Sequence, residues 1–157
     1  MSPTLVLWLH LSAAMILIGG LIAMRVVVRP VLKAAGPESR SHALMQQMGR
    51  RFRTLSWVCV VTLVLTGSFN LLNAGASERI ETDWGVILMI KLFAFAILVG
   101  LLLIHDFVLD PYRETSPVGS LKKPPRSFNR PMLDVLQGAI IATGLIVLFL
   151  AAYLAAL

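Results

Sequence analysis

The chain is poor in the residues that a disulfide scaffold or a common catalytic motif requires. Its 157 residues include one cysteine, Cys59, and only 14% of them are charged. A single cysteine excludes an intrachain disulfide and any metal or redox site built on a CxxC pair. The sequence also contains no glycine-rich phosphate loop, no HExxH motif and no nucleophile elbow. Whether the chain is an enzyme is therefore left open by its motifs.

Long apolar segments are what the sequence has instead. Hydrophobic residues make up 57% of the chain and the mean hydropathy is +0.82, whereas soluble domains are about half apolar and roughly a quarter charged. Four stretches, at about 4–30, 52–73, 84–108 and 131–157, are long enough to cross a hydrocarbon core about 30 Å thick as helices. The sequence predicts an all-α integral membrane protein: a single membrane domain over residues 1–157 that forms an antiparallel four-helix bundle.

The placement of basic residues predicts how this bundle is oriented. Lysine and arginine concentrate in the connections after the first and third segments, whereas the middle connection has Arg79 against Glu78, Glu81 and Asp83. The positive-inside rule places both basic connections in the cytoplasm and both termini on the outer side. Because nearly all of the positive charge is confined to these connections, we expect the lipid bilayer and not nucleic acid to be the partner.

Three polar residues are expected deep in the outer half of the membrane. His10 and Lys91 each lie about 10 Å below the outer surface by the helical rise, and Asn70 lies at a similar depth. A charged side chain in hydrocarbon costs roughly 2.5–3.5 kcal/mol on insertion scales. We therefore expect His10 and Lys91 to face a common cavity inside the bundle, and we call these three residues the outer cluster.

A second polar group, the inner cluster, is expected at the other membrane surface. It combines the ends of the first and third segments with the start of the fourth: Arg25, Arg29, His105, Asp106, Asp134 and Gln137. Lys91 and His105 fall within about 40° of one helix face and about 21 Å apart. One face of the third segment therefore connects the two clusters.

Histidine inside a helical bundle can ligate copper or haem iron. His10 and His105 are the candidate metal ligands, and their depths differ by about 20 Å, so they cannot share one haem. Met15, Met24 and Met89 could add thioether sulfur, and Asn70 could orient the His10 ring. The residues alone leave copper, haem b and a third role open, that of an accessory subunit of a larger membrane complex.

Three segments of the chain resemble the CopD-type copper-resistance membrane domain. They are LWLHLSAAMILIGGLIAMRVVVRPVL, RRFRTLSWVCVVTLVLTGSFNLL and IKLFAFAILVGLLLIHDFVLDP. The resemblance implies a multi-pass protein of the bacterial inner membrane that handles or transports copper, with both termini in the periplasm. It also implies His10, Lys91 and His105 as site residues, and a periplasmic copper-binding protein or other membrane subunits as partners.

A second resemblance is to the HemJ-type protoporphyrinogen oxidase, a haem-binding four-helix membrane enzyme. It rests on a histidine in the first helix, an arginine at the inner end of that helix and a lysine in the third helix. This resemblance implies that His10 ligates haem b while Arg25 and Lys91 contact porphyrin carboxylates. We rank the copper function first and this oxidoreductase second.

Overall fold

The computed structural model describes residues 2–34, 39–73, 81–108 and 130–156. Every element in these ranges is helical, and four helices are long and apolar enough to cross a membrane, as predicted. The elements are α1 (Pro3–Ala23), η1 (Met24–Val28), α2 (Arg29–Ala34), α3 (Ser39–Asn73), α5 (Asp83–Leu103), η2 (Ile104–Val108) and α6 (Arg130–Ala156), where η marks a π-helical turn.

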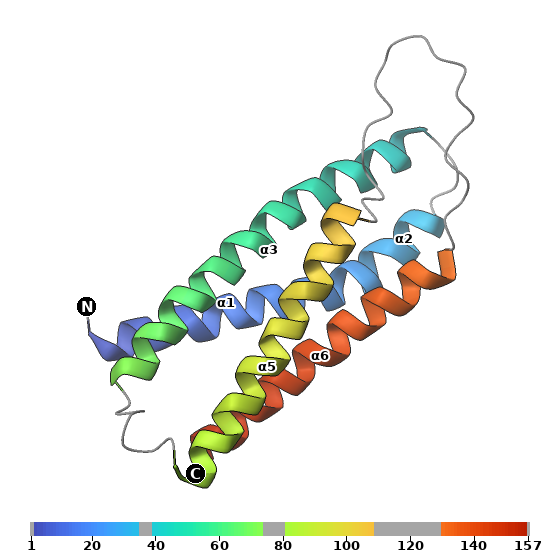
Figure 1. Ribbon diagram of the computed structural model, residues 1–157. Helices are drawn as coiled ribbons and strands as arrows, with labels where there is room; N and C mark the ends of the chain where they lie inside the picture. Colours follow the sequence, from blue (N-terminus) through green and yellow to red (C-terminus); the bar gives the residue numbers. More distant parts are fainter. Residues whose placement is uncertain (1, 35–38, 74–80, 109–129, 157) are drawn as a thin grey trace.

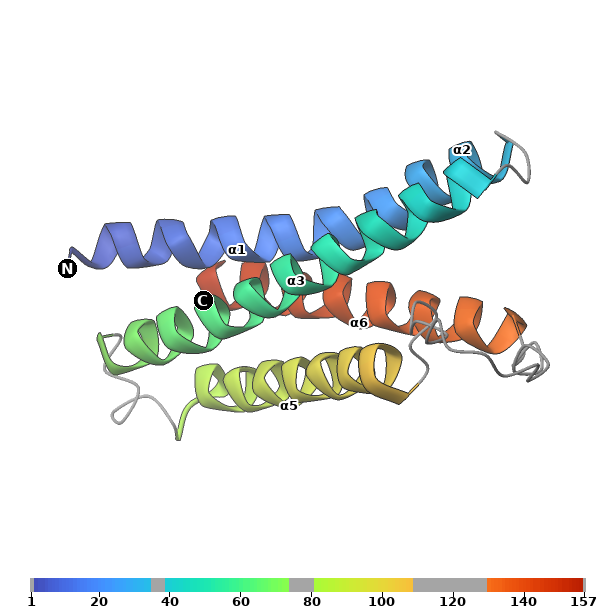
Figure 2. The ribbon, with the colours of Figure 1, turned by 90° about the horizontal axis from the view of Figure 1, so that it is seen from above.

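The four long helices run antiparallel to their neighbours in the chain, and both termini lie at the same end (Figure 1). We call this the terminal end, which holds Pro3, Asn73, Asp83 and Ala156; the opposite end, which holds α2 and η2, is the basic end. Helix α1 packs mainly on α3 and α5 mainly on α6, and contacts between α1 and α6 join the two pairs (Figure 2). The predicted antiparallel bundle is confirmed, whereas its orientation in the membrane stays a prediction.

Two helices extend beyond the predicted segments at the basic end. The first segment continues through η1 and α2 to Ala34, and α3 begins at Ser39 instead of near residue 52. Hydropathy detects only the part of a helix that suits the membrane, which in α3 is Gln47–Asn73. Leucine, methionine, glutamine and arginine also favour helix in water, so α3 continues past the apolar span.

A proline accounts for the π-helical turn in the first helix. Pro30 has no backbone N–H, and in an α-helix its ring would clash with the carbonyl of Val26. The chain widens just before it, so that the backbone N–H of Arg29 bonds to the carbonyl of Met24, five residues back. Both wide turns lie at the basic end, where η1 carries Arg25 and η2 carries His105 and Asp106. Such turns change the direction in which the following side chains point.

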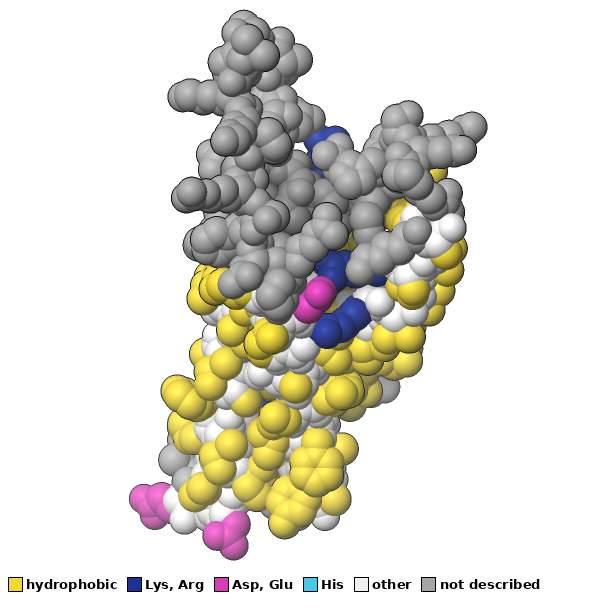
Figure 3. Space-filling model, turned by 90° about the vertical axis from the view of Figure 1, so that its right-hand side faces the viewer, with side chains coloured by type: hydrophobic (Ala, Val, Ile, Leu, Met, Phe, Trp, Pro, Cys, Tyr) yellow, Lys and Arg dark blue, Asp and Glu magenta, His cyan; other side chains and the backbone are white. Residues whose placement is uncertain are grey.

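An apolar layer fills the middle of the bundle. Leu17, Leu98 and Ile140 are each only 1% exposed, and they belong to one cluster with Ala13, Cys59, Val60, Leu63 and Leu102. Leu17 and Leu98 follow His10 and Lys91 by two helical turns, which is about 10 Å. The layer therefore separates the outer cluster from the inner one. Apolar side chains also cover the surface between the two ends of the bundle, as a membrane protein requires (Figure 3).

Candidate functional site

A threonine on α3 orients the ring of His10. The Nδ1 atom of His10 lies 2.8 Å from Oγ1 of Thr66, and the Thr66 hydroxyl donates to the carbonyl of Thr62 at 2.6 Å. A hydroxyl has one proton and a carbonyl can only accept, so the Nδ1–H of His10 must donate to the threonine oxygen. In the neutral ring, the lone pair then lies on Nε2, where it is available to a metal.

The ring of His10 also lies close to the backbone of α3. A Cβ atom at Gly67 would be 3.2 Å from Cε1 of His10, which is a tight contact. The missing side chain at Gly67 thus allows the imidazole to approach α3 next to Thr66. Thr66 and Gly67 were not among the predicted site residues.

Lys91 and Asn70 are the other two members of the outer cluster. Lys91 is half-buried on α5. Asn70 is also half-buried, but within the part of the chain that the structure describes no hydrogen bond joins it to His10. The orienting contact predicted for Asn70 is made by Thr66, one helical turn earlier on the same face of α3.

Asp106 is the centre of the inner cluster. Its carboxylate accepts a hydrogen bond from Nε1 of Trp57 at 3.0 Å and one from Nδ1 of His105 at 2.9 Å. Nε of Arg53 lies 3.8 Å from the same carboxylate. Trp57 and Arg53 were not among the predicted site residues. The signal for Trp57 was its place inside an apolar helix, where an indole N–H needs an acceptor.

Both nitrogens of His105 are engaged. Nε2 of Gln137 lies 3.1 Å from Nε2 of His105, and an amide nitrogen can only donate, so the histidine nitrogen accepts. The other ring nitrogen, Nδ1, carries a proton that points towards Asp106. A metal could bind here only after Gln137 moved, whereas Nε2 of His10 needs no such change. The remaining amide atom of Gln137, Oε1, is buried and has no partner among the described residues.

Two arginines link the first helix to the start of α6. Nη1 of Arg25 donates to the backbone carbonyl of Asp134 at 2.9 Å, and Nη1 of Arg29 donates to its side chain at 3.0 Å. The guanidinium of Arg25 lies against Gly138, where a Cβ atom would be 3.4 Å from Nη1. All six predicted residues of the inner cluster thus lie together at the basic end.

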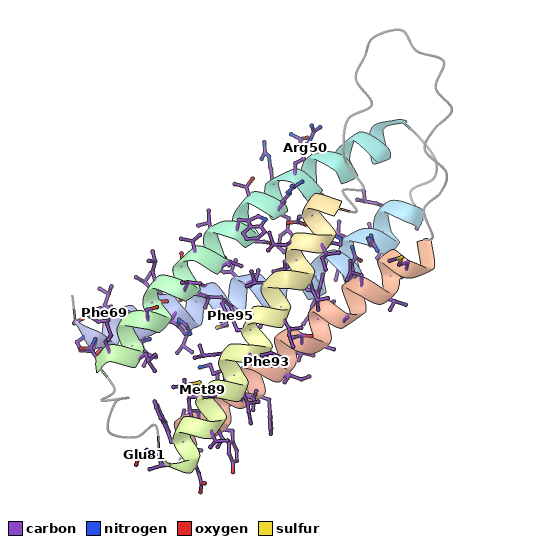
Figure 4. The ribbon with its side chains drawn as sticks, in the orientation of Figure 1. Arg50, Phe69, Glu81, Met89, Phe93 and Phe95 are labelled. Carbon is purple, nitrogen blue, oxygen red and sulfur yellow. The ribbon has the colours of Figure 1, made fainter. Side chains whose placement is uncertain are left out.

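These groups surround a cavity of about 90 Å³ at the basic end. Its polar lining comes from three helices and both π-helical turns: Arg25, Arg29, Arg53, Ser56, His105, Asp106 and Gln137. On one face of the molecule, basic side chains and one acidic side chain gather at the basic end, and acidic side chains lie at the terminal end (Figure 3). Arg50 and Glu81 mark the same two ends (Figure 4).

A metal centre with several protein ligands is not found in the described ranges, which contain no group of three or more His, Cys, Asp or Glu residues placed to hold an ion. The side chains of Met15 and Met89 are 72% and 54% exposed, as expected of residues that face lipid. Met24 lines the cavity at the basic end. His10 is therefore still only a candidate ligand, and among the described residues it does not belong to a group of three or more such side chains.

Comparison with known proteins identifies the family. Residues 46–154 match the family described as Copper resistance protein D (CopD), a range that includes α5 and most of α3 and α6 but not His10. The chain is also 30% identical over 146 residues to Copper resistance protein D of Pseudomonas syringae pv. tomato, which covers 88% of this chain. The chain spans only 45% of the length of that relative.

No solved structure matches this chain. The two sequence matches point to copper, and neither points to haem. They agree with the four apolar helices in indicating a multi-pass membrane protein related to copper resistance. The chain belongs to the CopD family of copper resistance proteins.

Proposed function

We propose that this chain moves copper across the inner membrane of a bacterium and that His10 is a copper ligand on the way. The observation that carries the proposal is the hydrogen bond from Nδ1 of His10 to Thr66, which leaves Nε2 to bind a metal. Imidazole is a good copper ligand. A hydrogen bond on the other ring nitrogen is the usual way in which a protein orients such a ligand.

A site with few protein ligands suits copper as cargo. An ion that is to be passed on must bind well enough to enter and weakly enough to leave. A single imidazole near the terminal end meets the second condition, and a periplasmic copper-binding protein would supply the ion from that side. His105 is a second candidate ligand at the basic end, once Gln137 releases its Nε2 atom.

The apolar layer around Leu17, Leu98 and Ile140 would act as the barrier between the two ends. A bare ion is costly in such a layer, so passage requires the helices to separate there. The arrangement of the bundle as two pairs, α1 with α3 and α5 with α6, offers a natural plane of separation.

The test is copper binding and transport by the purified chain in lipid vesicles. Copper(I) is supplied outside from a chromophoric chelator, and a second chelator inside reports its entry. Wild type should bind copper and admit it, and His10→Ala should lose most of both because no other imidazole lies at that depth. His105→Ala should retain binding at His10 and slow only entry.

The two histidine variants also separate the alternatives. Equal loss of copper binding in His10→Ala and His105→Ala would contradict the assignment of His10 as the main copper ligand. Wild-type protein that neither binds nor admits copper would remove the proposal altogether. Circular dichroism of each variant serves as the control for folding.

A further inference from the structure

We propose that the cavity at the basic end is a binding site for a phosphate group, supplied by an anionic phospholipid headgroup or by free phosphate. Three arginines line the cavity, from η1, α2 and α3, against one carboxylate, that of Asp106. This proposal does not depend on copper transport, because it concerns other residues at the other end of the bundle.

The carboxylates near the cavity are already engaged. Asp106 accepts hydrogen bonds from Trp57 and His105, and Asp134 pairs with Arg29. Arg53 also lies 3.8 Å from the carboxylate of Asp106. Arg25 differs from these residues, because its hydrogen bond goes to a neutral backbone carbonyl, and a phosphate group would compensate its charge.

Arg25 is the residue best placed to bind it. Its hydrogen bond goes to the backbone carbonyl of Asp134, which is neutral. A guanidinium has five N–H donors in a planar fork that matches phosphate oxygens. The guanidinium lies against α6 at Gly138, with its Nη1 and Nη2 atoms 3.4 and 3.8 Å from where a Cβ would be, so a side chain larger than alanine there would need its space.

The size and position of the cavity fit a headgroup phosphate. A volume of about 90 Å³ equals roughly three water molecules, enough for a phosphate group but not for a lipid chain. Basic side chains gather where the apolar surface ends (Figure 3), the level at which lipid phosphates lie. Basic pockets between membrane helices are known to bind anionic headgroups. Gln137 also lines this space, and its buried Oε1 atom, which has no partner among the described residues, needs a hydrogen-bond donor there, such as water.

The experiment compares three probes on the delipidated full chain in a neutral detergent. They are short-chain phosphatidylglycerol, phosphatidylcholine of the same chain length, and inorganic phosphate, each followed by the thermal unfolding midpoint and, for lipids, by native mass spectrometry. Phosphatidylglycerol should raise the midpoint more than phosphatidylcholine does. Inorganic phosphate should compete with it, and binding of phosphate without phosphatidylglycerol would assign the site to the free ion.

The decisive variants change one arginine at a time. Arg25→Gln should weaken binding by roughly tenfold or more, the loss typical of a charge-assisted hydrogen bond. The matched control is Arg50→Gln, since Arg50 is an exposed arginine at the same end (Figure 4) that does not line the cavity; it should change binding by less than about twofold.

A second pair of variants keeps the test valid if Arg25→Gln does not fold. Gly138→Leu should displace the guanidinium and weaken binding, because a Cβ there would already be in van der Waals contact with Nη1 of Arg25 at 3.4 Å, so that the rest of the leucine side chain needs the space that the guanidinium occupies. Gly100→Leu, where a Cβ would meet nothing within 4 Å, should not weaken binding. The proposal is overturned if neither probe binds the wild type. It is also overturned if Arg50→Gln loses as much binding as Arg25→Gln, because the effect would then be that of general surface charge.

Discussion

A single hydroxyl group decides which nitrogen of His10 can bind a metal. Thr66 cannot donate to the imidazole because its proton is used on the carbonyl of Thr62. It therefore accepts from Nδ1 and directs the lone pair to Nε2. At the basic end the same reasoning gives the opposite result, since Gln137 and Asp106 occupy both nitrogens of His105. Two histidines of the same helical bundle thus differ in their readiness to bind an ion.

Removing the Thr66 hydroxyl should weaken copper binding without removing the ligand. Thr66→Val keeps the shape of the side chain but leaves Nδ1–H of His10 without its acceptor. Loss of such an orienting contact typically costs roughly 10–100-fold in metal affinity. Copper(I) competition titrations on the purified chain measure the effect. Thr66→Ser retains the hydroxyl and is the control; valine and serine variants with equal affinity would contradict the role assigned to Thr66.

Two adjacent glycines of α1 differ in their surroundings, and only one of them lies at the contact with α3. Gly19 and Gly20 are adjacent in α1. A Cβ at Gly20 would lie 2.9 Å from Cζ of Phe52 on α3, whereas a Cβ at Gly19 would meet nothing within 4 Å. Gly20 therefore allows the contact between α1 and α3 near the cavity, and Gly19 lies in open space.

This difference predicts opposite effects of the same substitution at neighbouring positions. Gly20→Ala should lower the free energy of unfolding by about 1–3 kcal/mol, the usual cost of overpacking. Gly19→Ala should raise it by up to about 1 kcal/mol, because alanine favours helix over glycine. Reversible unfolding in mixed micelles of dodecyl sulfate measures both. Equal effects of the two substitutions would show that Phe52 moves aside at little cost.

The π-helical turns act at the same scale. They place Arg25, His105 and Asp106 on wide turns, so these side chains do not follow the regular period of 3.6 residues that sequence analysis assumed. The wide turn η1 could have been predicted from Pro30, which follows it in the sequence. The direction in which Arg25 points could not, because it depends on the packing of α1 on α6.

In the molecule as a whole, two groups of polar side chains lie towards opposite ends of the bundle, with an apolar layer between them. His10 and Lys91 lie towards the terminal end, the arginine-lined cavity lies at the basic end, and Leu17, Leu98 and Ile140 fill the space between. Any transported ion must therefore bind on one side before the helices move. The orientation of the bundle decides whether His10 meets copper from the periplasm.

Reporter fusions test that orientation. Seven basic residues lie within residues 25–53 and five within residues 113–130, so the positive-inside rule places both of these connections in the cytoplasm. Alkaline phosphatase fused after Leu157 should be active in the periplasm, and green fluorescent protein inserted at Ser120, outside the described residues, should fluoresce in the cytoplasm. The reverse pattern would invert the bundle and place His10 near the cytoplasm.

The four long helices, their antiparallel order and the position of each polar residue along its helix could be predicted from the sequence alone. These properties follow from the sum of transfer free energies along one segment and from a fixed rise per residue, which are local quantities. The placement of His10 and His105 towards opposite ends of the bundle and the grouping of the inner cluster were predictable for that reason, whereas the depth of each residue in the membrane stays a prediction. The family resemblance, too, was carried by short segments of the chain.

Only the tertiary structure decided which side chains touch. Thr66 and Asn70 share a face of α3 and either could reach His10 by sequence, but the rotation of α1 against α3 selects Thr66. The contact between Trp57 and Asp106 joins residues 49 positions apart, so no local pattern could indicate it. Such contacts depend on how helices rotate and tilt to fill space at close range, and that is settled by the packing of all four helices together.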